Sequence, residues 1–338
     1  MSVKSKKRNG RATIYEVAAE ANVSLATVSR VINGNGNVME ETRILVENAI
    51  EKLGYVPSNI ARGLAKSKTT NVAIVLPSPN YSYIHNILAG MFEVCKIYGY
   101  SPSVFTYEGI EDVHFVLDNV ISSRVDGIVL FNSQLSKDDL EKLSRNSLPM
   151  VIIGNEVFES SNGLVDILWS ETLKNVVRKK AENGLKSVYF LKDHHKDWHM
   201  TNMFEKACME AVEGTDCKFE TIWISDSYGV IYDYFKDQFA YEKPNHELYV
   251  TSRDSLACAI NNAAIDLGFK VPDDLETLGV VGTKQASMAR PTISTIDVDL
   301  FEVGSISMRM LTKLIKDSLD KKTFVFKTHY KRRNSTKL

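Results

Sequence analysis

The stretch TIYEVAAEANVSLATVSRVINGN, residues 13–35, determines how the N-terminal part of this chain folds. Over 14–20 its apolar residues recur at the spacing of one helix face, and Thr13 is suited to cap that helix. A turn of about three residues follows, after which Ser24 is suited to cap a second helix over 25–33. The stretch therefore predicts two short helices joined by a tight turn.

Two helices this short need a third one to bury a core. The segment 40–52 supplies it, because its apolar residues lie at helical spacing and Gly54 follows as a stop signal. The sequence thus predicts a three-helix bundle that contains a helix-turn-helix. A generic helical bundle is the alternative at this point.

The outer face of the second predicted helix carries side chains suited to DNA. Leu25, Ala26 and Arg30 project from its N-terminal half, where a recognition helix meets the edges of bases. Small and apolar side chains suit thymine methyl groups, and an arginine suits the O6 and N7 acceptors of guanine. The short polar residues suited to phosphate contacts are Ser24, Thr27, Ser29 and Asn33.

Charge is divided unevenly along the chain. Residues 1–68 hold eleven Lys and Arg against six Glu, whereas the remaining residues hold thirty basic against thirty-six acidic side chains. A basic head on an acidic body is typical of a polyanion-binding module attached to a soluble core. No apolar run approaches the roughly 20 residues that span a bilayer.

The stretch 13–35 and the segment TRILVENAIEKLGYVPSNIARGLAKSKT, residues 42–69, resemble the DNA-binding headpiece of the LacI/GalR family of bacterial repressors. The resemblance implies a transcription regulator, and it adds Thr13 and Tyr15 to the residues assigned to DNA. It also implies a homodimer on a pseudo-palindromic operator, because one headpiece reads one half-site.

A short hinge helix is predicted over 60–66, after the break at Pro57. Such a helix is too short to be stable alone in water, so we expect it to fold only with DNA and a partner subunit. In the family, two hinge helices pack in the minor groove and a leucine wedges between base pairs. By resemblance the wedge is Leu64, and the hinge residues assigned to DNA are Ala61, Arg62, Gly63, Leu64 and Lys66.

From residue 72 onward, short apolar segments alternate with amphipathic helical ones. This alternation predicts parallel sheets covered by helices on both faces, and the length predicts two successive doubly wound α/β subdomains. The region resembles the periplasmic-binding-protein-like core of the same family, in which the chain crosses between lobes three times. The expected divisions are a headpiece at 1–56, a hinge helix and linker at 57–70, a first core subdomain at 71–165 with 298–322, and a second at 166–297 with 323–338.

Sugar-responsive members of the family bind their ligand between the lobes, where Asp, Asn and Arg side chains hold hydroxyl groups. This sequence departs from that pattern at four places. The residues found instead are Val281 for an aspartate, Leu168 for another aspartate, Ser252–Arg253 for an Asn-Asp or Thr-Asp pair, and Gly184–Leu185 for a Gly-His pair. We therefore expect a cleft that does not hold a free sugar in the usual way.

The segment LFEVGSISMRMLTKLI, residues 300–315, resembles a helix of family members that respond to a protein, the phosphocarrier HPr phosphorylated on a serine. Arg309 and Lys313 are four positions apart, so they share a helix face and can hold one phosphate between them. The residues assigned to this coregulator are Phe301, Glu302, Ile306, Arg309, Met310 and Lys313. The alternatives are an ordinary solvated helix face and a local sugar-operon repressor with a small sugar or sugar phosphate in its cleft.

Nothing in the sequence supports catalysis or a cofactor. Walker, GxGxxG, GxSxG and HExxH motifs are absent, and four scattered cysteines suit reduced thiols in a cytoplasmic protein. His195 and His199 have the i,i+4 spacing of metal ligands, but histidines in polar loops are more often solvated. We expect a cytoplasmic, non-enzymatic repressor in carbon catabolite control. The rival is a solute-binding protein or sugar-processing enzyme that kept only the α/β core.

Overall fold

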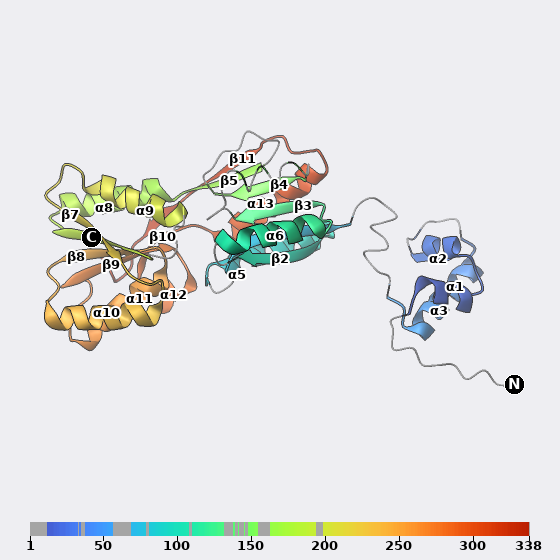
Figure 1. Ribbon diagram of the computed structural model, residues 1–338, viewed down its shortest axis with the longest axis horizontal. Helices are drawn as coiled ribbons and strands as arrows, with labels where there is room; N and C mark the ends of the chain where they lie inside the picture. Colours follow the sequence, from blue (N-terminus) through green and yellow to red (C-terminus); the bar gives the residue numbers. More distant parts are fainter. Residues whose placement is uncertain are drawn as a thin grey trace. The chain divides into compact units, whose positions relative to one another are not determined.

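The computed structural model describes residues 12–32, 34, 38–56, 69–78, 81–107, 110–131, 138, 141, 145, 148–154, 163–193 and 199–337. The chain divides into two compact units, Met1–Thr70 and Asn71–Leu338 (Figure 1). Within the described residues, no helix is both long enough and apolar enough to cross a membrane.

The first unit is a bundle of three helices, which are α1 (Ile14–Glu20), α2 (Leu25–Ile32) and α3 (Glu40–Leu53). Each helix contributes a fully buried valine to the centre, and these are Val17, Val28 and Val46. α1 begins with a capping box, because Glu16 N donates to the Thr13 hydroxyl over 3.4 Å and Thr13 N donates to the Glu16 carboxylate over 2.7 Å. α3 ends at Gly54, whose φ of 60° is left-handed. The predicted helix-turn-helix is confirmed.

The first core subdomain contains a six-stranded parallel sheet in the order β11-β5-β4-β3-β1-β2. Its strands are β1 (Asn71–Pro77), β2 (Ser101–Tyr107), β3 (Gly127–Phe131), β4 (Met150–Ile153), β5 (Gly163–Leu168) and β11 (Thr323–Lys327). One face is covered by α5 (Ile84–Tyr98) and α13 (Leu300–Ile315), and the other by α6 (Ile110–Ser122). Successive side chains of β1 point to opposite faces of the sheet, so Ile74 packs with α5 and α13 while Val75 packs with α6.

The second core subdomain contains a six-stranded sheet in the order β12-β10-β9-β8-β6-β7, with β12 antiparallel to β10. Its strands are β6 (Ser187–Lys192), β7 (Lys218–Trp223), β8 (Glu247–Thr251), β9 (Leu275–Val281), β10 (Ser294–Asp297) and β12 (His329–Lys331). In Figure 1, α8 (Trp169–Glu182) and α9 (His199–Val212) lie on one side of this sheet. The other side carries α10 (Tyr228–Tyr241), α11 (Asp254–Asp266) and α12 (Lys284–Met288).

Strand pairing corrects the expected division of the core. β5 pairs in parallel with β11, so 166–168 and 323–327 belong to the first subdomain and not to the second. The chain passes between the sheets after β5, after β10 and after β11, which agrees with the three crossings that the resemblance implies. α10 was not predicted, although its buried residues Ile231, Phe235 and Phe239 recur at every fourth position.

Candidate functional sites

The outer face of α2 carries the side chains predicted to read bases. Leu25, Ala26 and Arg30 are exposed, while Val28 on the opposite face is buried in the bundle. Arg30 makes no ion pair with any residue in the described part of the chain. This helix face therefore presents one cation and small apolar groups to solvent, which suits phosphates and base edges.

The polar residues assigned to DNA also have roles within the bundle. Ser24 Oγ accepts a hydrogen bond from Thr27 N over 3.1 Å, so Ser24 caps α2 as Thr13 caps α1. The Tyr15 side chain is 68% exposed, whereas Ser29 is half-buried. The other residues assigned to DNA fall outside the described residues, and they are Asn33, Ala61, Arg62, Gly63, Leu64 and Lys66.

A small cavity lies between the two core subdomains. Tyr83 lines it from the first subdomain, and residues at or just after the carboxyl ends of β6, β8 and β9 line it from the second. Its volume of about 30 Å³ has room for little more than a water molecule. Pockets for small ligands measure roughly 300–1,000 Å³, so a sugar does not fit in this arrangement of the lobes.

Arg253 bridges the two subdomains at this cavity. Its Nη2 donates to the carboxylate of Asp226 and, over 3.0 Å, to the Asp226 main-chain oxygen. Its guanidinium carbon lies 4.8 Å from the ring centroid of Tyr81 in the first subdomain. Tyr81 in turn stacks on Tyr83, with ring centroids 5.6 Å apart. Arg253, which stands where the resemblance leads us to expect an aspartate, therefore lines the cavity and contacts both subdomains.

This bridge is largely shielded from water. The side chains of Arg253 and Asp226 are only 16% and 11% exposed, so their attraction is weakly screened. Asp226 is held in place because its N–H donates to Asp193 Oδ2 over 2.8 Å. The Nε of Arg253 is buried without a hydrogen-bond partner among the described residues. Neither the role of Arg253 nor that of Asp226 was predicted from the sequence.

The other departures from the family pattern have different surroundings. Val281 gives the cavity an apolar wall, whereas Leu185 is buried in the core and Leu168 precedes α8, and neither lines the cavity. A nearby carboxylate, Asp254, is buried beneath the end of β9, where Thr283 N and the Thr283 hydroxyl donate to its Oδ2 over 2.5 and 2.8 Å. Burial raises the pKa of Asp254 to about 6, and its contacts hold the turn after β9.

On α13, every residue predicted to bind a coregulator is at least partly exposed, except one. Those fully at the surface are Phe301, Glu302, Arg309 and Lys313, while Ile306 is half-buried. Met310 is only 7% exposed and packs near Gly163. This corrects the prediction for Met310, because its position on the helix faces the sheet. Within the described residues, neither Arg309 nor Lys313 forms an ion pair.

Glycines allow α13 to pack closely on α5. A Cβ atom on Gly304 would lie 2.9 Å from the carbonyl carbon of Ile87, and one on Gly90 would lie 2.9 Å from Ser305 N. The Ser305 hydroxyl also donates to the Gly90 carbonyl over 3.3 Å. α13 is therefore fixed to the first subdomain, and its exposed face is a rigid surface.

Metal and thiol chemistry find little support. In the described part of the chain, no group of three or more His, Cys, Asp and Glu could hold a metal. His195 and the side chain of His199 fall outside that part. The four cysteines are free thiols, and burial raises the pKa of Cys95 to about 11 and that of Cys208 well above its ordinary value. Such thiols are poor nucleophiles.

A helix-turn-helix unit on the same chain as two α/β subdomains with a cavity between them defines a class of DNA-binding transcription regulators. Family models agree with this. Residues 13–58 match the bacterial regulatory proteins of the lacI family, and residues 177–336 match the periplasmic binding protein-like domain. The chain belongs to the lacI family, and it is a transcription regulator and not an enzyme.

Within that family the chain is similar to catabolite control protein A. The protein of Staphylococcus aureus strain MRSA252 is 31% identical over 316 residues, which cover 90% of this chain and 93% of the relative. The protein of Priestia megaterium is 30% identical over 340 residues, which cover 96% and 99%.

Solved structures agree on the fold. The Lac repressor bound to ONPG in its repressed state matches with a TM-score of 0.81 at 21% identity, covering 97% of this chain and 100% of that one. Transcription regulator CcpA of Lactococcus lactis matches with a TM-score of 0.64 at 23% identity, covering 79% and 99%.

Proposed function

We propose that this regulator acts in the cytoplasm as a homodimer on a pseudo-palindromic operator of carbon-metabolism genes. We further propose that its operator affinity is raised by HPr phosphorylated on a serine and docked on α13. We favour a protein coregulator because the cavity between the core subdomains measures only about 30 Å³ and is bridged by Arg253. With its effector cleft closed by its own side chain, the core needs another surface to receive a signal.

The exposed face of α13 has the chemistry for that signal. Arg309 and Lys313 share one helix face and form no ion pair with any described residue, so both are available to a phosphate. A phosphoserine carries about two negative charges, which the two cations can neutralise. Phe301, with 43% of its side chain exposed, adds an apolar anchor of the kind that protein interfaces bury. The coregulator site therefore consists of Phe301, Glu302, Ile306, Arg309 and Lys313.

At the DNA, the proposal assigns base reading to Leu25, Ala26 and Arg30. Their exposure on one face of α2, with the N-terminus of that helix capped by Ser24, supports this assignment. From the resemblance of the hinge segment to that of the family, the proposal also assigns Leu64 as the wedge in the minor groove.

A titration of operator DNA with the full chain tests the coregulator. The operator is first selected from random DNA, and binding is followed by fluorescence anisotropy with and without serine-phosphorylated HPr. We expect the phosphoprotein to raise operator affinity about tenfold or more. R309A/K313A should bind operator as the wild type does but lose the stimulation. K321A/K322A removes two exposed cations elsewhere in the first subdomain, and this control should keep it.

The same titration decides against the proposal in two ways. Stimulation that survives in R309A/K313A would remove α13 as the docking surface. A sugar or sugar phosphate that changes operator affinity without HPr would favour the alternative, a local sugar-operon repressor. Lys192, Asp193 and Arg253 line the cavity with polar groups, and this favours that alternative if the lobes open.

A further inference from the structure

A second and larger cavity lies on the second core subdomain, between α8 and the C-terminal segment. Its volume is about 540 Å³, within the range of small-molecule sites. The described residues that line it are Thr172, Asn175, Val176, Lys179, Lys180, Asn183, Tyr330, Arg332 and Lys337. Four of them are cations and none is a carboxylate. None of the described residues lines both this cavity and the one bridged by Arg253.

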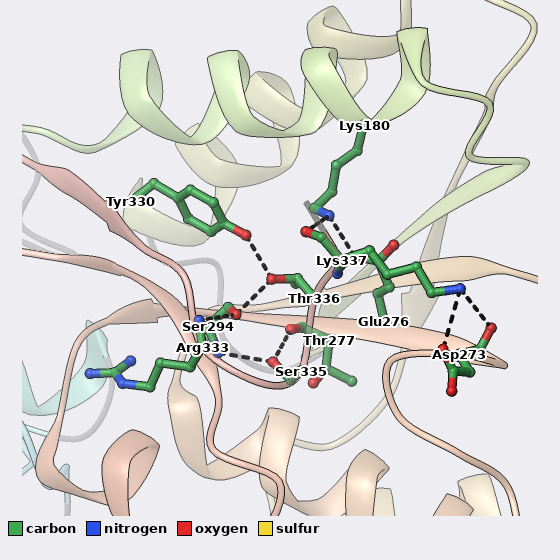
Figure 2. A network of polar contacts seen from close by, with 10 residues as sticks. All are labelled: Lys180, Asp273, Glu276, Thr277, Ser294, Tyr330, Arg333, Ser335, Thr336 and Lys337. Carbon is green, nitrogen blue, oxygen red and sulfur yellow. Dashed lines mark hydrogen bonds and ion pairs between the residues drawn. The ribbon is translucent and has the colours of Figure 1, made fainter.

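The wall formed by the C-terminal segment is anchored by a network of hydrogen bonds, which Figure 2 shows. Lys337 N donates to the Glu276 carboxylate over 2.9 Å, and the Lys337 carbonyl accepts from Lys180 Nζ over 3.2 Å. The hydroxyls of Tyr330 and Thr336 lie 2.6 Å apart. Since these bonds hold the chain on both sides of Arg332 and fix the main chain of Lys337, the cavity is formed before any ligand enters.

The cations around the cavity differ in how far they are neutralised. Lys180 Nζ lies 2.5 Å from the Glu276 carboxylate, and both side chains are under 10% exposed. The two opposite charges of this buried pair therefore neutralise each other. Lys337 Nζ lies 3.7 Å from Asp273, at a more exposed position. Lys179 and Arg332 are exposed and form no ion pair with any described residue. The cavity therefore keeps an excess of positive charge, carried mainly by its rim.

We propose that this cavity binds a small molecule that bears phosphate groups. Lys179 and Arg332 would hold the phosphate oxygens by charge-assisted hydrogen bonds. The amides of Asn175 and Asn183 and the ring of Tyr330 supply contacts to the rest of the ligand. A bound phosphate would neutralise the excess charge and join α8 to the C-terminal segment.

Calorimetric titration of the full-length protein with pyrophosphate tests this, with glycerol as the uncharged comparison and with constant ionic strength. We expect saturable binding of pyrophosphate and no heat from glycerol. In K179A/R332A the affinity should fall about tenfold or more, because two charge-assisted contacts are lost. Both residues are exposed, so the thermal unfolding midpoint should stay unchanged and show that the variant folds.

Two matched variants make the result decisive. K243A/K270A removes two exposed cations of the same subdomain that lie outside the cavity, and it should bind pyrophosphate as the wild type does. R253A should also keep binding, because Arg253 lines the other cavity. Absence of binding in the wild type, unchanged binding in K179A/R332A, an equal loss in K243A/K270A or a loss confined to R253A would each overturn the proposal.

Discussion

Removal of the Arg253 side chain is the most direct perturbation of the closed cleft. Breaking a buried ion pair from one side costs about 3–5 kcal/mol, because the remaining charge stays desolvated. The two side chains keep 16% and 11% exposure, which places the loss near the lower limit, about 3 kcal/mol. Loss of the cation–π contact with Tyr81 adds about 0.5–1 kcal/mol. The free energy of unfolding of R253A should therefore fall by about 3–4 kcal/mol.

Urea unfolding followed by tryptophan fluorescence measures this loss. Trp169, Trp198 and Trp223 all lie beyond Thr70, so their signal reports on the core unit and not on the headpiece. In D226A/R253A the Asp226 carboxylate is removed as well, so no unpaired charge stays buried. The free energy of unfolding of this double variant should therefore be at least about 1 kcal/mol higher than that of R253A. A loss in R253A below about 1 kcal/mol, or a double variant as unstable as R253A, would refute the bridge as a desolvated pair.

Three other perturbations test separate parts of the molecule. Leu64→Ala should weaken operator binding about tenfold or more in an anisotropy titration while the fold is kept, and unchanged affinity would remove the wedge assignment. Because the pKa of Asp254 is raised in the folded protein, protonation of its carboxyl group stabilises the folded state. This stabilisation is fully present below the ordinary pKa of 3.8 and is lost as the pH rises through about 6. Wild-type unfolding free energy should therefore fall by about 2 kcal/mol relative to Asp254→Asn between pH 4 and pH 7, and parallel pH curves would contradict this. Gly304→Ala should cost about 1–3 kcal/mol in urea unfolding, because its methyl group meets the main chain of Ile87, and wild-type stability would contradict the close packing.

The elements that were predictable from the sequence are those with local determinants. α1 is specified by the capping box of Thr13 and Glu16 and by apolar residues on one face, all within a few positions. β1 and β3 are continuous apolar runs because both faces of their sheet are covered. The recognition face of α2 follows from the same local periodicity. These features can be predicted from the local sequence without any knowledge of long-range contacts.

The errors and omissions involve contacts between distant parts of the chain. β11 was placed in the wrong subdomain because its partner β5 lies far away in sequence, and strand composition does not identify a partner. Met310 shares a helix side with Ile306, but its burial depends on how α13 is rotated against the sheet. The bridge from Arg253 to Asp226 spans 27 positions and combines two loops. Spacing along the sequence alone cannot locate such a pair.

A signal received on α13 has a short mechanical route through the first subdomain. β1 begins at Asn71, directly after Thr70 ends the DNA-binding unit. The apolar side chains of β1 pack with α5 and α13, and Gly90 and Gly304 fix these two helices together. The partner proposed for α13 would thus act on the same packed layer from which the chain leads back to the predicted hinge. A ligand in the cleft would first have to displace Arg253.

To shift operator affinity tenfold, the partner needs only about 1.4 kcal/mol of preference for one arrangement of the core. Phosphate contacts to Arg309 and Lys313 would supply that preference only by the amount by which they are stronger in one arrangement than in the other.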